Sequence, residues 1–341
     1  MNILLTGATG FLGAFILSEL GSTGTDNITC LVRARGKEQA RQRITQNLLR
    51  YQRQNCAAGA VIDALPGDLS KPSLGLTAEQ FFGLAKKIDV IYHNGALVSS
   101  MFAPSYVTAV NVVGTSWLAK LATTAVLKEL HYISSNSAGQ KIPSVYGDSK
   151  RRAEEVVIGL ASRGAPAAIY RLPRLAHDSR TGTPNESDIV FRLLSLILQT
   201  GHAPDIELTE PWIPVDLAAR TLLKTAGGLG RDGRRFALMP RNNVSLGFVL
   251  DTAGRNGFEI VVEESHDWMA RVKALSSPEH DLTLSALGLD VGYGAGLFGD
   301  EETPDESEDD QADGFEIVEG PSVDRDTLDR FFAWYRANRI S

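Results

Sequence analysis

The sequence predicts a doubly wound α/β fold followed by a smaller, mostly helical C-terminal lobe. In the first half, short apolar strand patterns alternate with helix patterns, and a glycine turn follows the first strand. This alternation is typical of one parallel sheet with helices on both faces. After Arg174 the alternation becomes irregular. We expect a sheet domain at 1–175, with a return segment near 205–240, and a second lobe at 176–341.

The elements of the first half follow from apolar runs separated by polar turns. Short runs rich in β-branched and aromatic side chains predict strands, and longer runs with helical periodicity predict helices. The expected strands are 1–5, 28–33, 61–65, 90–93, 130–134 and 167–171, and the expected helices are 11–20, 37–51, 78–85, 106–127 and 149–162.

Beyond Arg174 the sequence predicts five helices and two short strands. We expect the helices at 188–199, 217–224, 245–254, 265–275 and 323–338, and the strands at 212–215 and 235–239. The last helix is amphipathic, because Leu328, Phe331, Phe332 and Tyr335 share one side of it.

Composition indicates a soluble globular protein. The chain has 341 residues, a hydrophobic content of 43% and a formal net charge of −7. No apolar run has membrane-spanning length, so we expect no membrane association. Cys30 and Cys56 are its two cysteines, which give neither a disulfide framework nor a metal site. We therefore expect a cytoplasmic, metal-free protein.

Residues 300–314 are strongly acidic and contain no base. We predict a mobile acidic loop here, with a docking site for a partner as the alternative. The rest of the chain is close to neutral, so we expect no nucleic-acid partner.

The glycine turn predicts a dinucleotide site. Gly7, Gly10 and Gly13 follow the first strand and open the first helix, which is the context that this motif requires. Glycines let the backbone approach a pyrophosphate, whose charge meets the helix N-terminus. A turn without a ligand is the alternative. The expected cofactor contacts here are Thr6, Gly7, Thr9, Gly10, Phe11, Leu12 and Gly13.

The end of the second strand predicts NADPH rather than NADH. An acid at this position binds the ribose 2′-hydroxyl, whereas an arginine favours a 2′-phosphate. Here Arg33 ends the strand, no acid follows before Glu38, and Arg43 can reach the phosphate from the next helix. The alternative is that these arginines are solvated surface residues.

Further cofactor contacts are expected after the third and fourth strands. Asp68 and Leu69 lie where such folds hold the adenine, and Asn94, Gly95 and Ala96 lie where the chain passes under the cofactor. We interpret Asn111 as a structural residue that supports Lys150.

A catalytic group is predicted at the fifth strand and the following helix. Tyr146 and Lys150 are four residues apart and share one helix face, where the ammonium can lower the pKa of the phenol. Ser134 and Ser135 end the fifth strand, where a hydroxyl can bind a carbonyl oxygen that becomes negative. An exposed helix-start pair is the alternative for Tyr146 and Lys150.

Together, these motifs resemble the short-chain dehydrogenase/reductase superfamily. In related families with two hydroxyl residues here, the second does the work, which implies Ser135, with Ser134 as the alternative. The ten residues between Ser135 and Tyr146 make a shorter loop than extended reductases usually carry.

Several segments resemble thioester reductases more narrowly. These are terminal reductase domains of nonribosomal peptide and polyketide synthases, and of carboxylic acid and aminoadipate reductases. The matching segments are Cys30–Ala34, Pro66–Leu69, Leu74–Thr77, His93–Ala96, Asn111–Thr115, Tyr146–Glu154, Tyr170–Pro173, Thr181–Asp188 and Pro214–Asp216.

The resemblance implies a Rossmann domain, a substrate lobe and NADPH-dependent reductive release of a carrier-bound phosphopantetheinyl thioester. The product would be an aldehyde, which a second hydride would convert to an alcohol. Ser135, Tyr146 and Lys150 would be catalytic. Tyr146, Lys150 and Pro173 would join the cofactor contacts, with Lys150 at the nicotinamide ribose. The partner would be an acyl or peptidyl carrier protein. We expect a monomer.

Two other functions stay open. One is an extended short-chain reductase or epimerase that acts on a small free ketone, aldehyde or nucleotide sugar. The other is a redox-inactive cofactor-sensing protein, although such proteins commonly lose the tyrosine or lysine that is present here.

Overall fold

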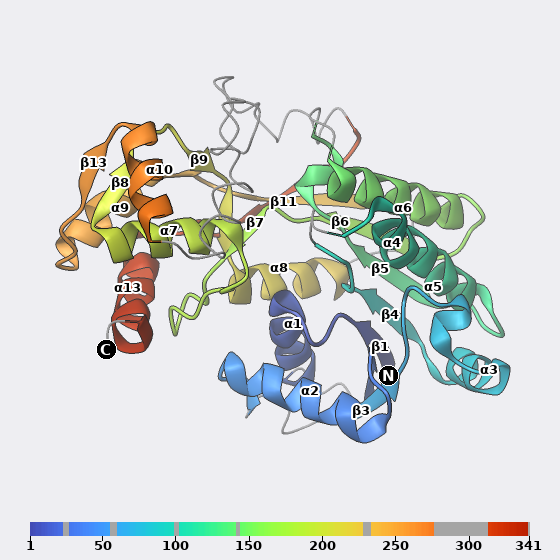
Figure 1. Ribbon diagram of the computed structural model, residues 1–341. Helices are drawn as coiled ribbons and strands as arrows, with labels where there is room; N and C mark the ends of the chain where they lie inside the picture. Colours follow the sequence, from blue (N-terminus) through green and yellow to red (C-terminus); the bar gives the residue numbers. More distant parts are fainter. Residues whose placement is uncertain are drawn as a thin grey trace. The chain divides into compact units, whose positions relative to one another are not determined.

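The computed structural model describes residues 1–22, 27–54, 60–98, 102–140, 144–227, 233–275 and 313–339 (Figure 1). They form two units. The first contains Met1–Pro173, Val215–Met239 and 313–320, and the second contains Arg174–Pro214, 240–275 and 321–339. Cys56 and residues 300–312 of the expected acidic loop lie outside the described residues.

The first unit is built on one large sheet, which confirms the doubly wound fold. Its strand order runs β14-β11-β6-β5-β4-β1-β2-β3, and the pairs from β3 to β11 are parallel. The order reverses between β1 and β4, which is where ligands bind in such sheets. The strands are β1 (Asn2–Thr6), β2 (Asn27–Val32), β3 (Val61–Pro66), β4 (Val90–His93), β5 (Glu129–Ile133), β6 (Ala167–Arg171), β11 (Arg235–Pro240) and β14 (Glu316–Gly320).

Helices cover both faces of this sheet (Figure 1). On one side, α3 (Ala78–Lys87), α5 (Gly114–Thr123) and α6 (Val145–Ala161) bury apolar side chains against the strands. On the other side, α1 (Phe11–Ser22) packs against α8 (Val215–Gly227), and α2 (Lys37–Arg50) follows β2. The six strands expected in the first half are all present.

One expected helix, 106–127, is present but ends four residues early. The chain stays helical through α4 (Pro104–Thr108), the π-helical stretch η3 (Ala109–Val113) and α5, which ends at Thr123. Ala125 then takes a positive φ of 64°, and the Lys128 ammonium donates to the carbonyls of Thr124 and Val126 at 2.8 and 2.7 Å. These contacts hold the turn that follows the helix.

The helix with Tyr146 begins four residues earlier than expected. Ser144 caps it, because its side chain accepts a hydrogen bond from the Gly147 backbone nitrogen at 2.9 Å. A Cβ on Gly147 would lie 2.4 Å from the Ser137 carbonyl oxygen, so glycine lets the helix start approach the turn after β5. Tyr146 therefore lies in the first turn of α6.

The second unit combines helices with small two-stranded sheets. Its helices α7 (Ile189–Thr200), α9 (Leu246–Arg255), α10 (Ser265–Ala274) and α13 (Arg325–Arg339) surround one apolar core. The expected apolar side of the last helix is confirmed, since its four members are buried there. The strand pairs are β7 (Arg174–Ala176) with β10 (Trp212–Pro214), β8 (His202–Pro204) with β13 (Val261–Glu263), and β9 (Thr209–Glu210) with β12 (Val244–Ser245).

The Thr181–Asp188 segment has a structural role in this unit. Gly182 has a φ of +71°, and a Cβ on it would lie 2.1 Å from the Arg330 carbonyl oxygen of α13. Asp188 caps α7, accepting from the Val190 backbone nitrogen at 2.9 Å. This segment thus joins α7 to α13.

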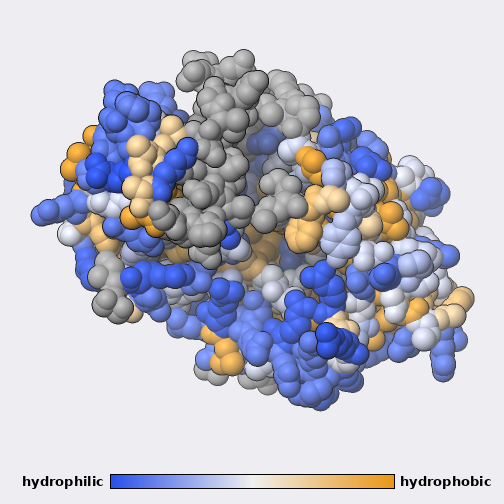
Figure 2. Space-filling model, viewed as in Figure 1, coloured by the Kyte–Doolittle hydropathy of each residue, from blue (hydrophilic) through white to orange (hydrophobic). Residues whose placement is uncertain are grey.

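The face drawn in Figure 2 is mostly hydrophilic, and its apolar residues lie in separate small groups. In the described ranges, no helix is both long enough and apolar enough to cross a bilayer.

Candidate functional site

The glycine turn after β1 is tightly packed. Gly7 has a φ of +76°, and its carbonyl oxygen accepts from the Gly10 backbone nitrogen at 3.0 Å. A Cβ on Gly13 would lie 2.0 Å from that oxygen, and a Cβ on Gly7 would lie 2.8 Å from the Gly95 nitrogen. Side chains would therefore displace neighbouring backbone at both positions, so the close packing of this turn requires glycine.

Asn47 of α2 also holds this turn, a contact that sequence reasoning missed. Its amide Nδ2 donates to the carbonyl oxygens of Ala8 at 3.0 Å and Gly10 at 2.9 Å. The partners are backbone atoms far away in the sequence, so no motif marks the contact.

Arg33 and Arg43 lie together at the end of β2. The exposed Arg33 donates from Nη1 to the Tyr106 hydroxyl at 3.0 Å, and the Arg43 guanidinium donates to the Arg33 carbonyl oxygen. Two cations thus stand where NAD-binding folds carry an acid.

The chain after β3 packs against the residues that follow β4. The Asp68 carboxylate accepts from the Ser70 backbone nitrogen and hydroxyl at 2.9 and 2.7 Å. Leu69 packs so closely that a Cβ on Gly95 would lie 2.9 Å from its Cδ1. Asn94 and Ala96 are half-buried beside Gly95, and Pro173 is buried after β6.

A buried hydrogen-bond chain links this turn to the catalytic helix. Thr6 Oγ1 bonds to His93 Nδ1 at 2.8 Å and accepts from the Gly95 nitrogen at 2.9 Å, while His93 Nε2 bonds to Thr115 Oγ1 at 2.9 Å. Thr115 donates its hydrogen to the Asn111 carbonyl oxygen at 2.5 Å. Thr115 therefore accepts from His93, and we assign the proton of a neutral imidazole to Nε2.

Asn111, in the π-helical stretch η3, continues this chain of hydrogen bonds. Its Oδ1 accepts from the Leu97 backbone nitrogen at 2.7 Å, and its Nδ2 donates to Ser149 Oγ at 2.8 Å. The Ser149 hydroxyl donates to the Tyr146 carbonyl oxygen at 2.7 Å. Asn111 thus ties the loop after β4 to the first turn of α6.

The structure brings Ser135 and Tyr146 together. Burial raises the pKa of the Tyr146 phenol to about 12, and the nearby Ser135 side chain partly opposes this shift. Ser135 also contacts Ser137, with 3.3 Å between the two Oγ atoms. Ser134 faces elsewhere: its hydroxyl donates to Glu154 Oε1 at 2.5 Å, and its side chain is buried.

Lys150 lies one turn after Tyr146 on α6, but its ammonium has other partners. Its Nζ donates to the Ile133 carbonyl oxygen at 2.6 Å and lies 4.3 Å from the centre of the Tyr132 ring. Burial lowers the pKa of Lys150 to about 7, and the nearby Glu154 partly opposes this shift. The expected lowering of the Tyr146 pKa by Lys150 is thus absent, because burial raises that pKa.

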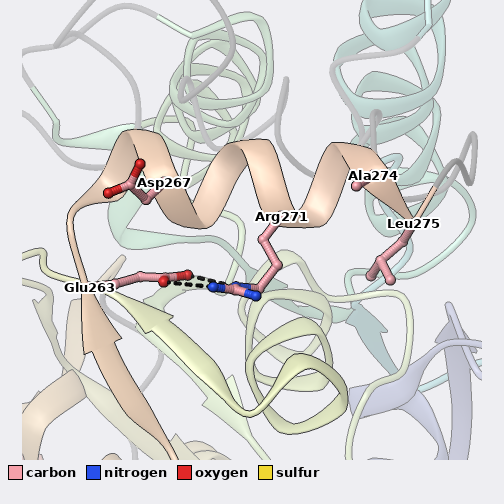
Figure 3. A pocket seen from close by; sticks show the side chains of 5 residues that line it. All are labelled: Glu263, Asp267, Arg271, Ala274 and Leu275. Carbon is pink, nitrogen blue, oxygen red and sulfur yellow. Dashed lines mark hydrogen bonds and ion pairs between the residues drawn. The ribbon is translucent and has the colours of Figure 1, made fainter.

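Among the described residues of the second unit, a hollow of about 590 Å³ lies open beside α10 (Figure 3). Glu263 and Arg271 pair within it, with N–O distances of 2.9 and 3.0 Å. A smaller one lies between Arg174 and Phe331. Neither pocket includes a residue of the predicted site, and the residues that the structure describes contain no cluster able to hold a metal ion.

A family model described as "Male sterility protein", an NAD-binding family, matches residues 5–141 and 136–222. The chain belongs to this NAD-binding family. The reductase also resembles the terminal R domain from the myxalamid PKS-NRPS biosynthetic pathway, with 30% identity and a TM-score of 0.83. That match covers 98% of this chain and 90% of the other. The chain is thus an NAD(P)-dependent oxidoreductase of the extended short-chain type, and the resemblance to terminal reductase domains is confirmed.

Curated relatives include much longer enzymes. A linear gramicidin synthase protein of Brevibacillus parabrevis is 33% identical over 290 residues, which are 79% of this chain and 6% of that protein. L-2-aminoadipate reductase of Saccharomyces cerevisiae is 27% identical over 310 residues, which are 80% of this chain and 22% of that protein. The reductase thus spans less than a quarter of either relative.

The buried state of His93 gives a prediction about pH. Burial, and secondarily Lys150, lower the pKa of His93 to about 3, whereas an unfolded histidine binds a proton near pH 6.5. Between these values the unfolded chain holds one proton more, so stability falls as pH falls, by up to about 1.4 kcal/mol per pH unit.

Nitrogen NMR of the His93 ring should show a neutral imidazole at pH 5, with the proton on Nε2. A ring that gains its second proton near pH 6.5 in the folded reductase would contradict this description of the network.

Proposed function

We propose that this chain uses NADPH to reduce a phosphopantetheinyl thioester on a carrier protein and releases the acyl or peptidyl group as an aldehyde. The observation that carries the proposal is the placement of Ser135 near Tyr146, with Lys150 one turn after Tyr146 on α6. Its setting supports thioester chemistry, because the relatives are reductase domains of peptide and polyketide synthases.

The residues at the β1–β4 edge fit a dinucleotide. Gly7, Gly13 and Gly95 have no room for a side chain, so backbone lines the place where a pyrophosphate would meet the start of α1. When bound, the cofactor supplies the hydride. Thr6–Gly13 would hold its pyrophosphate, Asp68 and Leu69 its adenine, and Asn94–Ala96 with Pro173 the remainder.

The arginine pair supports NADPH. The Arg43 guanidinium donates to the Arg33 backbone carbonyl, so both arginines lie at the end of β2, where a 2′-phosphate would bind. Arg33 would meet the 2′-phosphate, and Tyr106 would orient its side chain.

In the proposed reaction, the Ser135 and Tyr146 hydroxyls hold the thioester carbonyl oxygen. Negative charge develops on this oxygen as the carbonyl carbon is reduced, and two donors stabilise it. With a pKa of about 12, Tyr146 stays protonated at neutral pH and can donate its proton. The resulting hemithioacetal expels the carrier thiol and leaves the aldehyde.

Lys150 would support this step by charge and position. With a pKa of about 7, its amine can hold or release a proton near neutral pH. It would also bind the nicotinamide ribose.

The proposed partner is an acyl or peptidyl carrier protein. A solved thiolation-reductase di-domain from an archaeal nonribosomal peptide synthetase, 21% identical, has the same fold with a TM-score of 0.77. We propose that the reductase acts in the cytoplasm as a monomer.

Arg33→Ala tests the cofactor preference. Loss of a charge-assisted contact should weaken NADPH binding by about 1–3 kcal/mol and leave NADH binding nearly unchanged. Dissociation constants of both cofactors measure this. Arg35→Ala is the matched control, because Arg35 is also exposed and follows the same strand. An equal loss for both cofactors would remove Arg33 from the 2′-phosphate site.

Tyr146→Phe and Ser135→Ala test the chemistry. Tyr146→Phe keeps the ring, so folding and NADPH binding should survive while thioester reduction falls by about 10²–10⁴. Ser135→Ala removes one donor to the oxygen and should reduce the rate by about 10²–10³.

Ser134→Ala is the control for this pair. It should lower the rate of thioester reduction less than Ser135→Ala does, since the Ser134 hydroxyl bonds to Glu154. A larger loss in Ser134→Ala than in Ser135→Ala would reverse the serine assignment. Retained thioester turnover in Tyr146→Phe would contradict the mechanism.

A further inference from the structure

A buried ion pair lies behind the proposed catalytic group. Glu154 of α6 and Arg171 at the end of β6 are both 3% exposed. Arg171 donates from Nε to Glu154 Oε1 at 3.1 Å and from Nη2 to Oε2 at 2.9 Å. Removing either charge would leave the other buried and uncompensated, so each residue requires the other.

This pair contacts the end of the chain segment that carries Ser135. The helix contacts β5 and its following residue twice, through Lys150 to the Ile133 carbonyl and through Glu154 to the Ser134 hydroxyl. Ser135 is the next residue and lies near Tyr146. Backbone bonds to the Tyr170 and Leu172 carbonyls hold Ser134 and Asn136, so the Glu154 contact acts mainly on the side chains between them.

Asp313 reaches the same ion pair from a distant part of the sequence. Its carboxylate accepts from Arg171 Nη1 at 2.8 Å, and its side chain is 49% exposed, against 3% for Arg171. The Phe315 ring lies 4.0 Å from the Arg171 guanidinium carbon. The segment before β14 thus fixes Arg171 with a charge and an aromatic face.

We propose that Asp313 is a positioning residue for the reduction: it holds Arg171 in its two-bond contact with Glu154 and so keeps Ser135 opposite Tyr146. The inference rests on the proposed function, because it assigns Ser135 and Tyr146 to the carbonyl oxygen. Displacements of about 1 Å at such a site can lower the rate by up to about 10².

Asp313→Asn is the test, since it removes the charge and keeps the shape. We expect kcat for NADPH-dependent thioester reduction to fall by about tenfold. NADPH affinity should change less than about twofold, because the cofactor edge is not touched. The melting temperature should stay close to wild type, because a half-exposed ion pair contributes little to stability.

Glu316→Gln is the matched control. Glu316 lies three residues later and pairs with Arg234, and both side chains are exposed. The Glu316→Gln variant loses the same charge at a site away from the buried pair, so its kcat should equal that of the wild-type protein. Asp313→Glu should restore most of the rate. Equal kcat values in Asp313→Asn, Glu316→Gln and wild type would overturn the inference.

A double variant separates positioning from a general structural effect. Because Asp313 acts through Glu154 and Ser134, adding Asp313→Asn to a Ser134→Ala variant should lower kcat only slightly further. Fully additive losses, or a parallel fall in melting temperature, would overturn the inference. Tyr146→Phe in the same assay monitors the proposed function. Retained activity there would contradict that function, and with it the role of Ser135 used here.

Discussion

The contact between α6 and the end of β5 is the constraint on which the proposed chemistry depends. Lys150 and Glu154, one helical turn apart, both bond to consecutive residues of that chain end. Both side chains are almost completely buried, and each ionisable group has a defined partner. A hydroxyl can stabilise developing charge only if its position is fixed beforehand, and in the proposed mechanism this contact holds the chain end that carries Ser135.

The cofactor edge depends on a second constraint, the close approach of the turns after β1 and β4. Glycine at positions 7 and 95 permits this approach, and Thr6 with His93 fixes it by hydrogen bonds. The same chain of bonds continues through Thr115 and Asn111 to Ser149. The two halves of the proposed site are thus connected by buried polar contacts, in which an unpaired group would be costly.

The sequence predicted the first six strands because each is an apolar run between turns. It also predicted that Arg33 and Arg43 lie together, because Arg33 ends the second strand and Arg43 lies on the helix that follows. It did not predict contacts that are set by tertiary structure. The 106–127 helix contains a π-helical stretch whose Asn111 bonds to Leu97, and Asn47 bonds to backbone of the glycine turn. The contact between Ser134 and Glu154, which favours Ser135 in the proposal, joins residues far apart in the sequence. Strands of two or three residues, such as β9 and β7, exist only through their partners.

The central claim is that the site reduces a thioester and releases the carrier thiol. The most direct measurement compares a carrier-bound acyl thioester, the acyl-CoA, the free aldehyde and a simple ketone, counting NADPH oxidised and thiol released. We expect the carrier thioester to be turned over, with one NADPH oxidised per thiol released for an aldehyde product and two for an alcohol. Reduction of the ketone without thiol release from either thioester would contradict the account.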